Sequence, residues 1–210
     1  KNTKIFATII VLVNNSSNFA QADKTKFYQK MVQNLGQFAA CQSIEDFNNL
    51  SNQFARIAQV EKEEWLPLYY AAHCKIIMSF MENEDKVKKD AYLDEADVFF
   101  ESLEKIAPEE SEVYALKAFY YTARLVVDPA TRGQEYSMKI QQEAGKSLAI
   151  NANNPRAQYI VLSNEIGFAK FFGKETVEEC KRVNTLFENW DAMQSENPLM
   201  PSWGKDQVEG

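Results

Sequence analysis

Glycine, proline and histidine are scarce in this sequence. Its 210 residues include 7 glycines and 6 prolines, too few for a fold of many short strands and tight turns. His73 is the single histidine, so no second histidine is present to share a metal ion. The sequence has no glycine-rich phosphate loop, no HExxH and no G-x-S-x-G motif. These absences argue against catalysis, and we expect neither an enzyme nor a bound cofactor.

Dense clusters of basic residues are also missing. The chain has 23 Lys and Arg against 30 Asp and Glu, a formal net charge of −7. Nucleic-acid phosphates and anionic membrane surfaces both attract cations, so we expect neither as a partner. The acidic stretches at 61–64 and 82–85 are interpreted as solvated helix ends and loops, with an acid–base pair or a calcium site as the alternative.

The first 22 residues have the order of a secretory signal peptide. Lys1 and Lys4 precede an apolar run at 5–13, and a small-x-small cleavage site ends at Ala22. The apolar run is about half the length that spans a bilayer as a helix, so cleavage is favoured over an anchor. No cysteine follows to form a lipobox. We therefore expect a mature domain over 23–210, periplasmic or secreted, without a membrane span.

Apolar residues, 45% of the chain, recur at helical spacing beyond the signal peptide. Trp65, Leu68, Tyr69, Ala72 and Ile76 follow steps of three and four, which places them on one helical stripe. We predict eight helices in four antiparallel pairs: 24–41 with 43–60, 64–82 with 86–106, 110–127 with 131–151, and 155–172 with 175–194. Local signals mark their ends: a loose capping box at Ser43 and Asp46, breaks at Pro108 and Pro129, Pro155 in a first turn, and Gly173 after a last turn.

One spacing recurs in the second helix of successive pairs. It is clearest at Ala96, Phe100, Leu103 and Pro108. Further copies begin at Ile140, at Leu186 and, more weakly, at Leu50. In the first helices a second frame reads Trp65-x2-Leu68, Val113-x2-Leu116 and Tyr159-x2-Leu162, with copies starting 46–48 residues apart.

These frames resemble the tetratricopeptide (TPR) repeat family, and the overall character resembles small exported TPR-like proteins of Bacteroidota-type bacteria. The family's glycine is absent from every copy, and its period is about 34 residues. The resemblance implies an all-α, right-handed α-solenoid of about four antiparallel helical hairpins. Stacked hairpins of this kind bury a continuous core and form a concave face.

The resemblance also implies a binding face. Carried over residue by residue, the concave positions include Leu66 and Cys74, Ala118 and Thr122, Ile160 and Gly167, and six candidate contact residues: Tyr70, His73, Tyr114, Tyr121, Asn164 and Phe168. We expect a non-catalytic scaffold that engages a protein, a peptide or a second copy of itself there. The alternative is a small-molecule or glycan receptor with a closed pocket beside Tyr70 and Tyr121. Another interpretation packs these aromatics under longer helices or against a capping helix that begins at Trp203.

Three cysteines leave an odd thiol in an exported chain. A Cys41–Cys74 bridge between neighbouring hairpins is one interpretation, and three buried free thiols are the other. Residues 208–210 fall early in what reads as a new helix, which suggests that the chain continues beyond Gly210.

Overall fold

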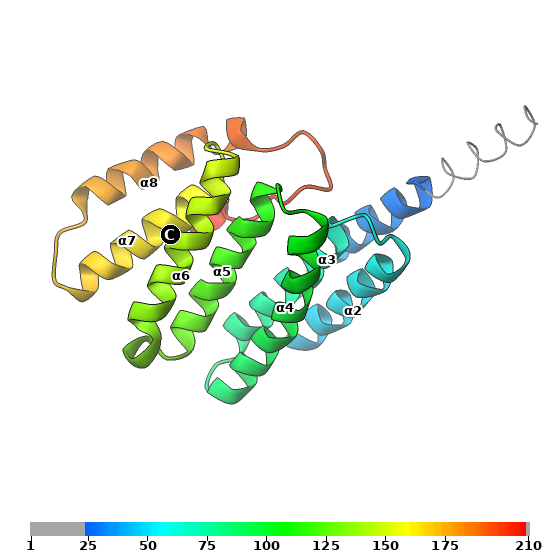
Figure 1. Ribbon diagram of the computed structural model, residues 1–210, viewed down its shortest axis with the longest axis horizontal. Coiled ribbons are helices and arrows are strands. Elements are labelled where there is room, and N and C mark those ends of the chain that lie inside the picture. The colour runs from blue at the N-terminus through cyan, green and yellow to red at the C-terminus, as the bar shows by residue number, and fades with distance from the viewer. Residues whose placement is uncertain (1–23, 209–210) are drawn as a thin grey trace, which may run out of the picture.

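The protein is all-α in the computed structural model, which describes residues 24–208 (Figure 1). Its elements are a helix over 24–40, α2 (Ile44–Val60), α3 (Leu66–Met81), α4 (Lys86–Ile106), α5 (Ser111–Val127), α6 (Pro129–Ile150), α7 (Pro155–Phe171), α8 (Val177–Asn189), a 3-10 turn η1 (Asp191–Met193) and α9 (Lys205–Val208). Over the described range no strand occurs, and the predicted all-α fold of helical hairpins is confirmed. The predicted signal peptide at 1–22 lies outside the described residues. Among the described helices, none is long and apolar enough to cross a membrane.

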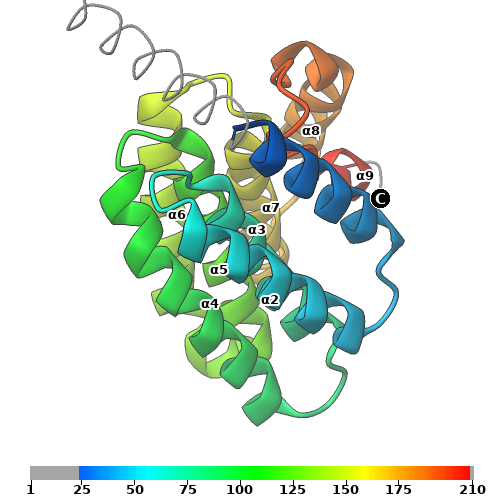
Figure 2. The same cartoon turned by 90° about the vertical axis from the view of Figure 1, so that its right-hand side faces the viewer.

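Consecutive helices pack against each other along the chain. α2 packs on α3, α3 on α4, α5 on α6 and α7 on α8, while α3 also contacts α5 and α5 contacts α7 (Figures 1 and 2). The first helices of successive hairpins therefore form one layer. This layer is the face that the sequence frames assigned to binding.

The recurring spacing in the second helices marks core positions. Ala96, Phe100 and Leu103 are almost completely buried, and so are the corresponding residues of α2 and α6. In the last copy, Trp190 is 1% exposed and fills the space between α7 and α8. The periodicity therefore reports which side of each second helix packs inward.

Local capping chemistry sets several helix ends. The Ser43 hydroxyl accepts from the Asp46 amide at 3.1 Å, while the Asp46 carboxylate accepts from the Ser43 amide at 3.0 Å, a reciprocal capping box. α7 ends in a Schellman turn at Gly173, whose φ of 66° is left-handed. There the Lys174 amide donates to the Ala169 carbonyl at 2.9 Å and the Gly173 amide donates to Lys170 at 3.1 Å. Both ends agree with the sequence prediction.

After η1 the chain turns back across the layer of first helices. We call residues 194–204 the C-terminal strap (Figure 1). The Tyr70 hydroxyl donates to the Leu199 carbonyl at 2.8 Å, and the Trp203 indole N–H donates to the Tyr69 hydroxyl at 2.8 Å. Leu199 is 5% exposed and belongs to the main core. The strap thus covers the outward side of α3 with a layer of the chain itself.

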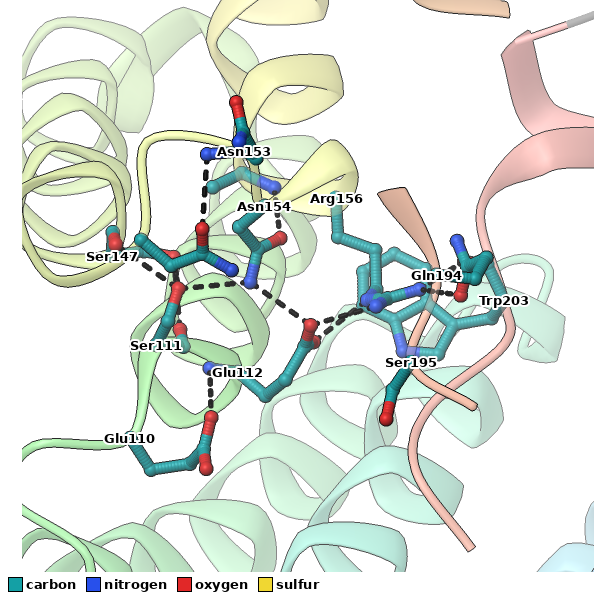
Figure 3. Close-up of polar contacts among 12 residues, drawn as sticks. Glu110, Ser111, Glu112, Ser147, Asn153, Asn154, Arg156, Gln194, Ser195 and Trp203 are labelled. Atoms are coloured by element: carbon teal, nitrogen blue, oxygen red, sulfur yellow. Dashed lines mark hydrogen bonds and ion pairs between the residues drawn. The ribbon is translucent and has the colours of Figure 1, made fainter. Parts of the chain in front are cut away.

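A buried polar network holds the strap in place (Figure 3). The Arg156 guanidinium makes a bidentate ion pair with Glu112, at 2.7 Å to each carboxylate oxygen. The same guanidinium donates to the Gln194 side chain at 3.1 Å and to the Trp203 carbonyl at 3.3 Å. Asn154 caps α7 and donates to Glu112 at 2.9 Å. Charges this deeply buried are tolerated because their hydrogen-bonding groups find partners.

Candidate functional site

The candidate site is an apolar cavity of about 1220 Å³. It lies among α5, α6 and α7 and is closed at one end by the last turns of α3. Six aromatic side chains line it: Phe80, Phe119, Tyr159, Phe168, Phe171 and Phe172. Aliphatic and small residues make up most of the rest, and none of the lining residues carries a charge. Its volume suffices for a ligand of cofactor size.

Three phenylalanines at the end of α7 form one edge of the cavity. Phe168, Phe171 and Phe172 are 54%, 81% and 58% exposed. Their rings touch one another, with centroids 4.6 Å apart for Phe168 and Phe172 and 5.2 Å apart for Phe171 and Phe172. The glycine turn at Gly173 stops the helix just beyond them. A contiguous exposed apolar cluster beside a cavity is typical of a binding surface.

A few polar groups interrupt the apolar lining. They are Thr122, Gln134, Ser137, Ser163 and Asn164. The Thr122 hydroxyl donates back to the Ala118 carbonyl of its own helix at 3.0 Å. The Asn164 amide approaches the Ser137 carbonyl at 3.5 Å, which is long for a hydrogen bond. Polar groups of this number can orient a ligand, while the apolar surface provides most of the binding energy.

Metal-binding chemistry is sparse in the described part of the chain. No group of three or more His, Cys, Asp or Glu side chains there is placed to hold a metal ion. Among the cavity residues, Tyr159 and Met81 carry the side chains that ligate iron in other proteins. The three cysteines are free thiols: Cys74 is buried, Cys41 half-buried and Cys180 exposed. The Cys41–Cys74 bridge is therefore not formed, and of the three cysteines expected to be buried only Cys74 is fully so.

A second, smaller hollow of about 410 Å³ lies between α7 and α8. Arg182 and Lys181 line it, but Arg182 pairs with Glu165 at 2.7 Å and Lys181 pairs with Glu178 at 2.8 Å. These are exposed ion pairs of the ordinary solvated kind. The larger cavity is the better candidate.

Two of the six sequence-predicted site residues lie at the cavity. Asn164 and Phe168 line it, together with Thr122, Ile160 and Gly167, which the repeat frame also placed on the concave wall. The cavity wall therefore contains all the concave-face residues predicted for the fourth hairpin, together with Thr122 from the third.

Tyr70 and His73 lie beneath the C-terminal strap. The ring of His73 packs between Phe38, at 5.2 Å between centroids, and Trp203, at 5.1 Å. Burial, reinforced by the nearby Arg156 charge, lowers the pKa of His73 to about 3, and its Nδ1 atom is buried without a hydrogen-bond partner. Burial likewise raises the pKa of the Tyr70 hydroxyl. Both residues are 4% exposed or less, so neither offers a contact surface to another molecule.

Tyr114 and Tyr121 lie apart from both the strap and the cavity. The Tyr114 hydroxyl donates to the Pro108 carbonyl at 2.8 Å, and Lys146 lies over its ring. Tyr121 contacts the rings of Tyr120 and Tyr136. The large cavity thus opens on a different part of the layer from the pocket expected beside Tyr70 and Tyr121.

Sequence reasoning missed most of the aromatic lining. Phe80 lies at the end of α3, while Phe171 and Phe172 lie at the end of α7, outside the repeat positions that were carried over. One signal was present in the sequence. Residues 168–172 contain three phenylalanines at the end of a helix, more than its buried stripe requires.

No protein-family model matches this sequence, and no curated protein matches it. Among solved structures, the chain is similar to the HusA haemophore from Porphyromonas gingivalis, a bacterium of the Bacteroidota. The two folds superpose with a TM-score of 0.75 at 25% sequence identity. The match covers 87% of this chain and 89% of that chain. In fold, over nearly its whole length, this chain is similar to an all-helical haemophore.

Proposed function

We propose that this protein is an exported, non-catalytic carrier that binds a flat, largely apolar molecule of the porphyrin class, such as haem, in the cavity among α5, α6 and α7. The observation that carries the proposal is the apolar cavity of about 1220 Å³ with its edge of exposed phenylalanines. The likeness to a haemophore supports this choice of ligand class. The signal-like N-terminus supports a periplasmic or secreted location. We further propose that the hairpins are long, divergent TPR-type repeats, which the core positions of the second helices support.

A small molecule is favoured over a protein or peptide on the same face. The strap already covers Tyr70 and His73, where a peptide was expected to bind. A deep apolar cavity suits a compact ligand better than an extended chain, because it contacts the ligand on several sides.

The cavity chemistry suggests how a porphyrin would be bound. Its ring would be buried among aromatic and aliphatic side chains, where transfer from water and ring stacking both favour binding. Because no lining residue is basic, the carboxylates at one edge of the porphyrin would stay in water. Binding should therefore depend little on salt concentration.

The iron should contribute little to affinity. His73 lies under the strap and does not line the cavity, and Tyr159 and Met81 are the lining residues able to ligate a metal. We expect iron-free protoporphyrin to bind within about tenfold of haem, a difference of about 1.4 kcal/mol or less.

Titration of the purified protein with haem and with iron-free protoporphyrin tests the proposal. Saturable quenching of tryptophan fluorescence and a raised melting temperature are expected for both ligands, since a ligand bound by the native state stabilises it. The double variant Phe168→Ala/Phe171→Ala should lose at least about tenfold in affinity, because it removes two apolar contact surfaces.

Tyr28→Ala is the matched control. Tyr28 is 46% exposed, lies in the first helix and does not line the cavity, so its affinity should equal that of the wild type. Failure of the wild-type protein to bind either porphyrin would refute the proposal. Equal affinities for the wild type and the double phenylalanine variant would refute the assignment to this cavity.

A further inference from the structure

Two glycines lie in the wall of the cavity, Gly133 in α6 and Gly167 in α7. Glycine inside a helix makes the helix less stable than alanine would, because the glycine backbone loses more conformational freedom on folding. The usual structural reason for keeping one is a close approach by another part of the protein. A Cβ atom built on Gly133 or Gly167 meets nothing within 4 Å, so no neighbouring helix or side chain requires either glycine.

The remaining helical glycines provide a comparison. Gly36 and Gly145 also have open space at the Cβ position and are exposed, as Gly167 is, but neither of them lines the cavity. Gly133 and Gly167 instead share one apolar cavity from two helices that pack against each other. Gly145 lies in the same helix as Gly133, which makes it a matched control.

We infer that Gly133 and Gly167 are specificity-determining residues, whose bare backbone supports one face of a flat ligand. This inference rests on the proposed function and adds the shape for which the cavity selects. Without a Cβ atom, a rigid ring can approach the helix backbone to van der Waals distance, about 3.5–4 Å. A flexible or twisted molecule can bend around an added methyl group, but a rigid flat ring cannot.

The same surface explains why the lining combines glycine with bulky aromatics. Phe119 and Phe168 also line the cavity, and the two glycines remove protrusions from the helices beside them. A cavity built for flexible chains would gain from methyl groups at these positions, because each would add apolar contact. The ligand class that fits is therefore a planar macrocycle.

The test compares Gly133→Ala, Gly167→Ala and Gly145→Ala in the full chain. Each alanine should raise the melting temperature, by about 2–4 °C, because each replaces a helical glycine in open space. Gly133→Ala and Gly167→Ala should weaken binding of iron-free protoporphyrin by about fivefold to tenfold. Gly145→Ala should leave that affinity unchanged.

A second probe separates shape from volume. Biliverdin is an open-chain tetrapyrrole of similar composition that does not stay flat, so the alanines at 133 and 167 should weaken its binding much less. A lower melting temperature for either cavity variant would show that the glycine serves packing, and would overturn the inference. So would porphyrin affinities within twofold of wild type, or equal losses for both tetrapyrroles. Failure of the wild-type protein to bind protoporphyrin refutes the proposed function instead, so the two failures are distinguishable.

Discussion

Phe119 lies between two regions of the layer of first helices. One region is covered by the strap, and the other lines the cavity. On one side its ring stacks on Trp203 of the strap, with centroids 4.9 Å apart. It also stacks on Phe80, at 5.1 Å, and both of those phenylalanines line the cavity. The strap side is covered by the chain itself, whereas the cavity side is open to a ligand.

The two regions differ in their polar chemistry. On the strap side, Tyr69, Tyr70 and Arg156 have hydrogen-bond partners contributed by the strap. The cavity side has glycines, hydroxyls and phenylalanines, and no charged group. A surface covered by the chain's own segment can have fixed hydrogen-bond partners in that segment, as Tyr69, Tyr70 and Arg156 do. A surface that receives a ligand stays apolar and lacks such fixed partners.

The largest effect should come from breaking the buried Arg156–Glu112 ion pair under the strap. Arg156→Ala should lower the free energy of unfolding by about 3–5 kcal/mol, since it leaves the buried Glu112 carboxylate without its countercharge. Urea unfolding followed by far-ultraviolet circular dichroism measures this loss. Arg182→Ala is the control, because its exposed pair with Glu165 should contribute about 1 kcal/mol or less. Similar losses of stability for the two variants would mean that the buried ion pair under the strap contributes no more than an exposed one.

Gly204, at the end of the strap, should give the next largest effect. Its φ is 110°, and an added Cβ would lie 2.8 Å from the Trp190 ring. Gly204→Ala should therefore destabilise the fold by about 2–3 kcal/mol, through both backbone strain and steric overlap. At Gly173, beside the cavity, φ is 66° but nothing lies within 4 Å of the added atom. Gly173→Ala should thus cost only about 1 kcal/mol, from the backbone alone. A larger loss at Gly173 in thermal unfolding would reverse the comparison.

The smallest effect is pH-dependent and also belongs to the strap side. The pKa of His73 is about 3 in the folded protein and near 6.5 in an unfolded chain. Between these values the unfolded chain binds a proton that the folded chain does not. The contribution of the neutral His73 to the free energy of unfolding is therefore fully present above about pH 6.5. Below that pH it falls by about 1.4 kcal/mol per pH unit. Measured at pH 7.5 and pH 5.5, His73→Phe should lose less stability on acidification than the wild type, because Phe has no proton to bind. Equal losses would exclude His73 as the source.

Most of the fold was predictable because its determinants are local. The apolar steps of three and four, Pro155 in the first turn of α7 and Gly173 after its last turn all act within a few residues. The predicted start of α6 was late by two residues, because Pro129 itself forms its first turn. The predicted α8 was too long at both ends, since the helix spans Val177–Asn189.

The strap and the cavity depend on contacts distant in sequence. Tyr70 and Leu199 are 129 positions apart, and residues 194–204 have no periodicity that would link them to α3. Without the strap, the repeat frame treated Tyr70 and His73 as free surface. The frame also placed Asn164, Gly167 and Phe168 on this face, and they line the cavity, in a part of the layer where the strap contributes no lining residue.

The late position of the strap in the chain has a consequence for folding order. The hydrogen bond between Tyr69 and Trp203 joins residues 134 positions apart, so it cannot form until residue 203 has been synthesised. Contacts this distant close slowly, because the entropy of closing the loop is lost before the contact stabilises anything. Until then the aromatic surface of α3 stays exposed, which makes incomplete chains prone to aggregation. Chains cut before residue 199 should therefore aggregate more readily than chains that include the strap.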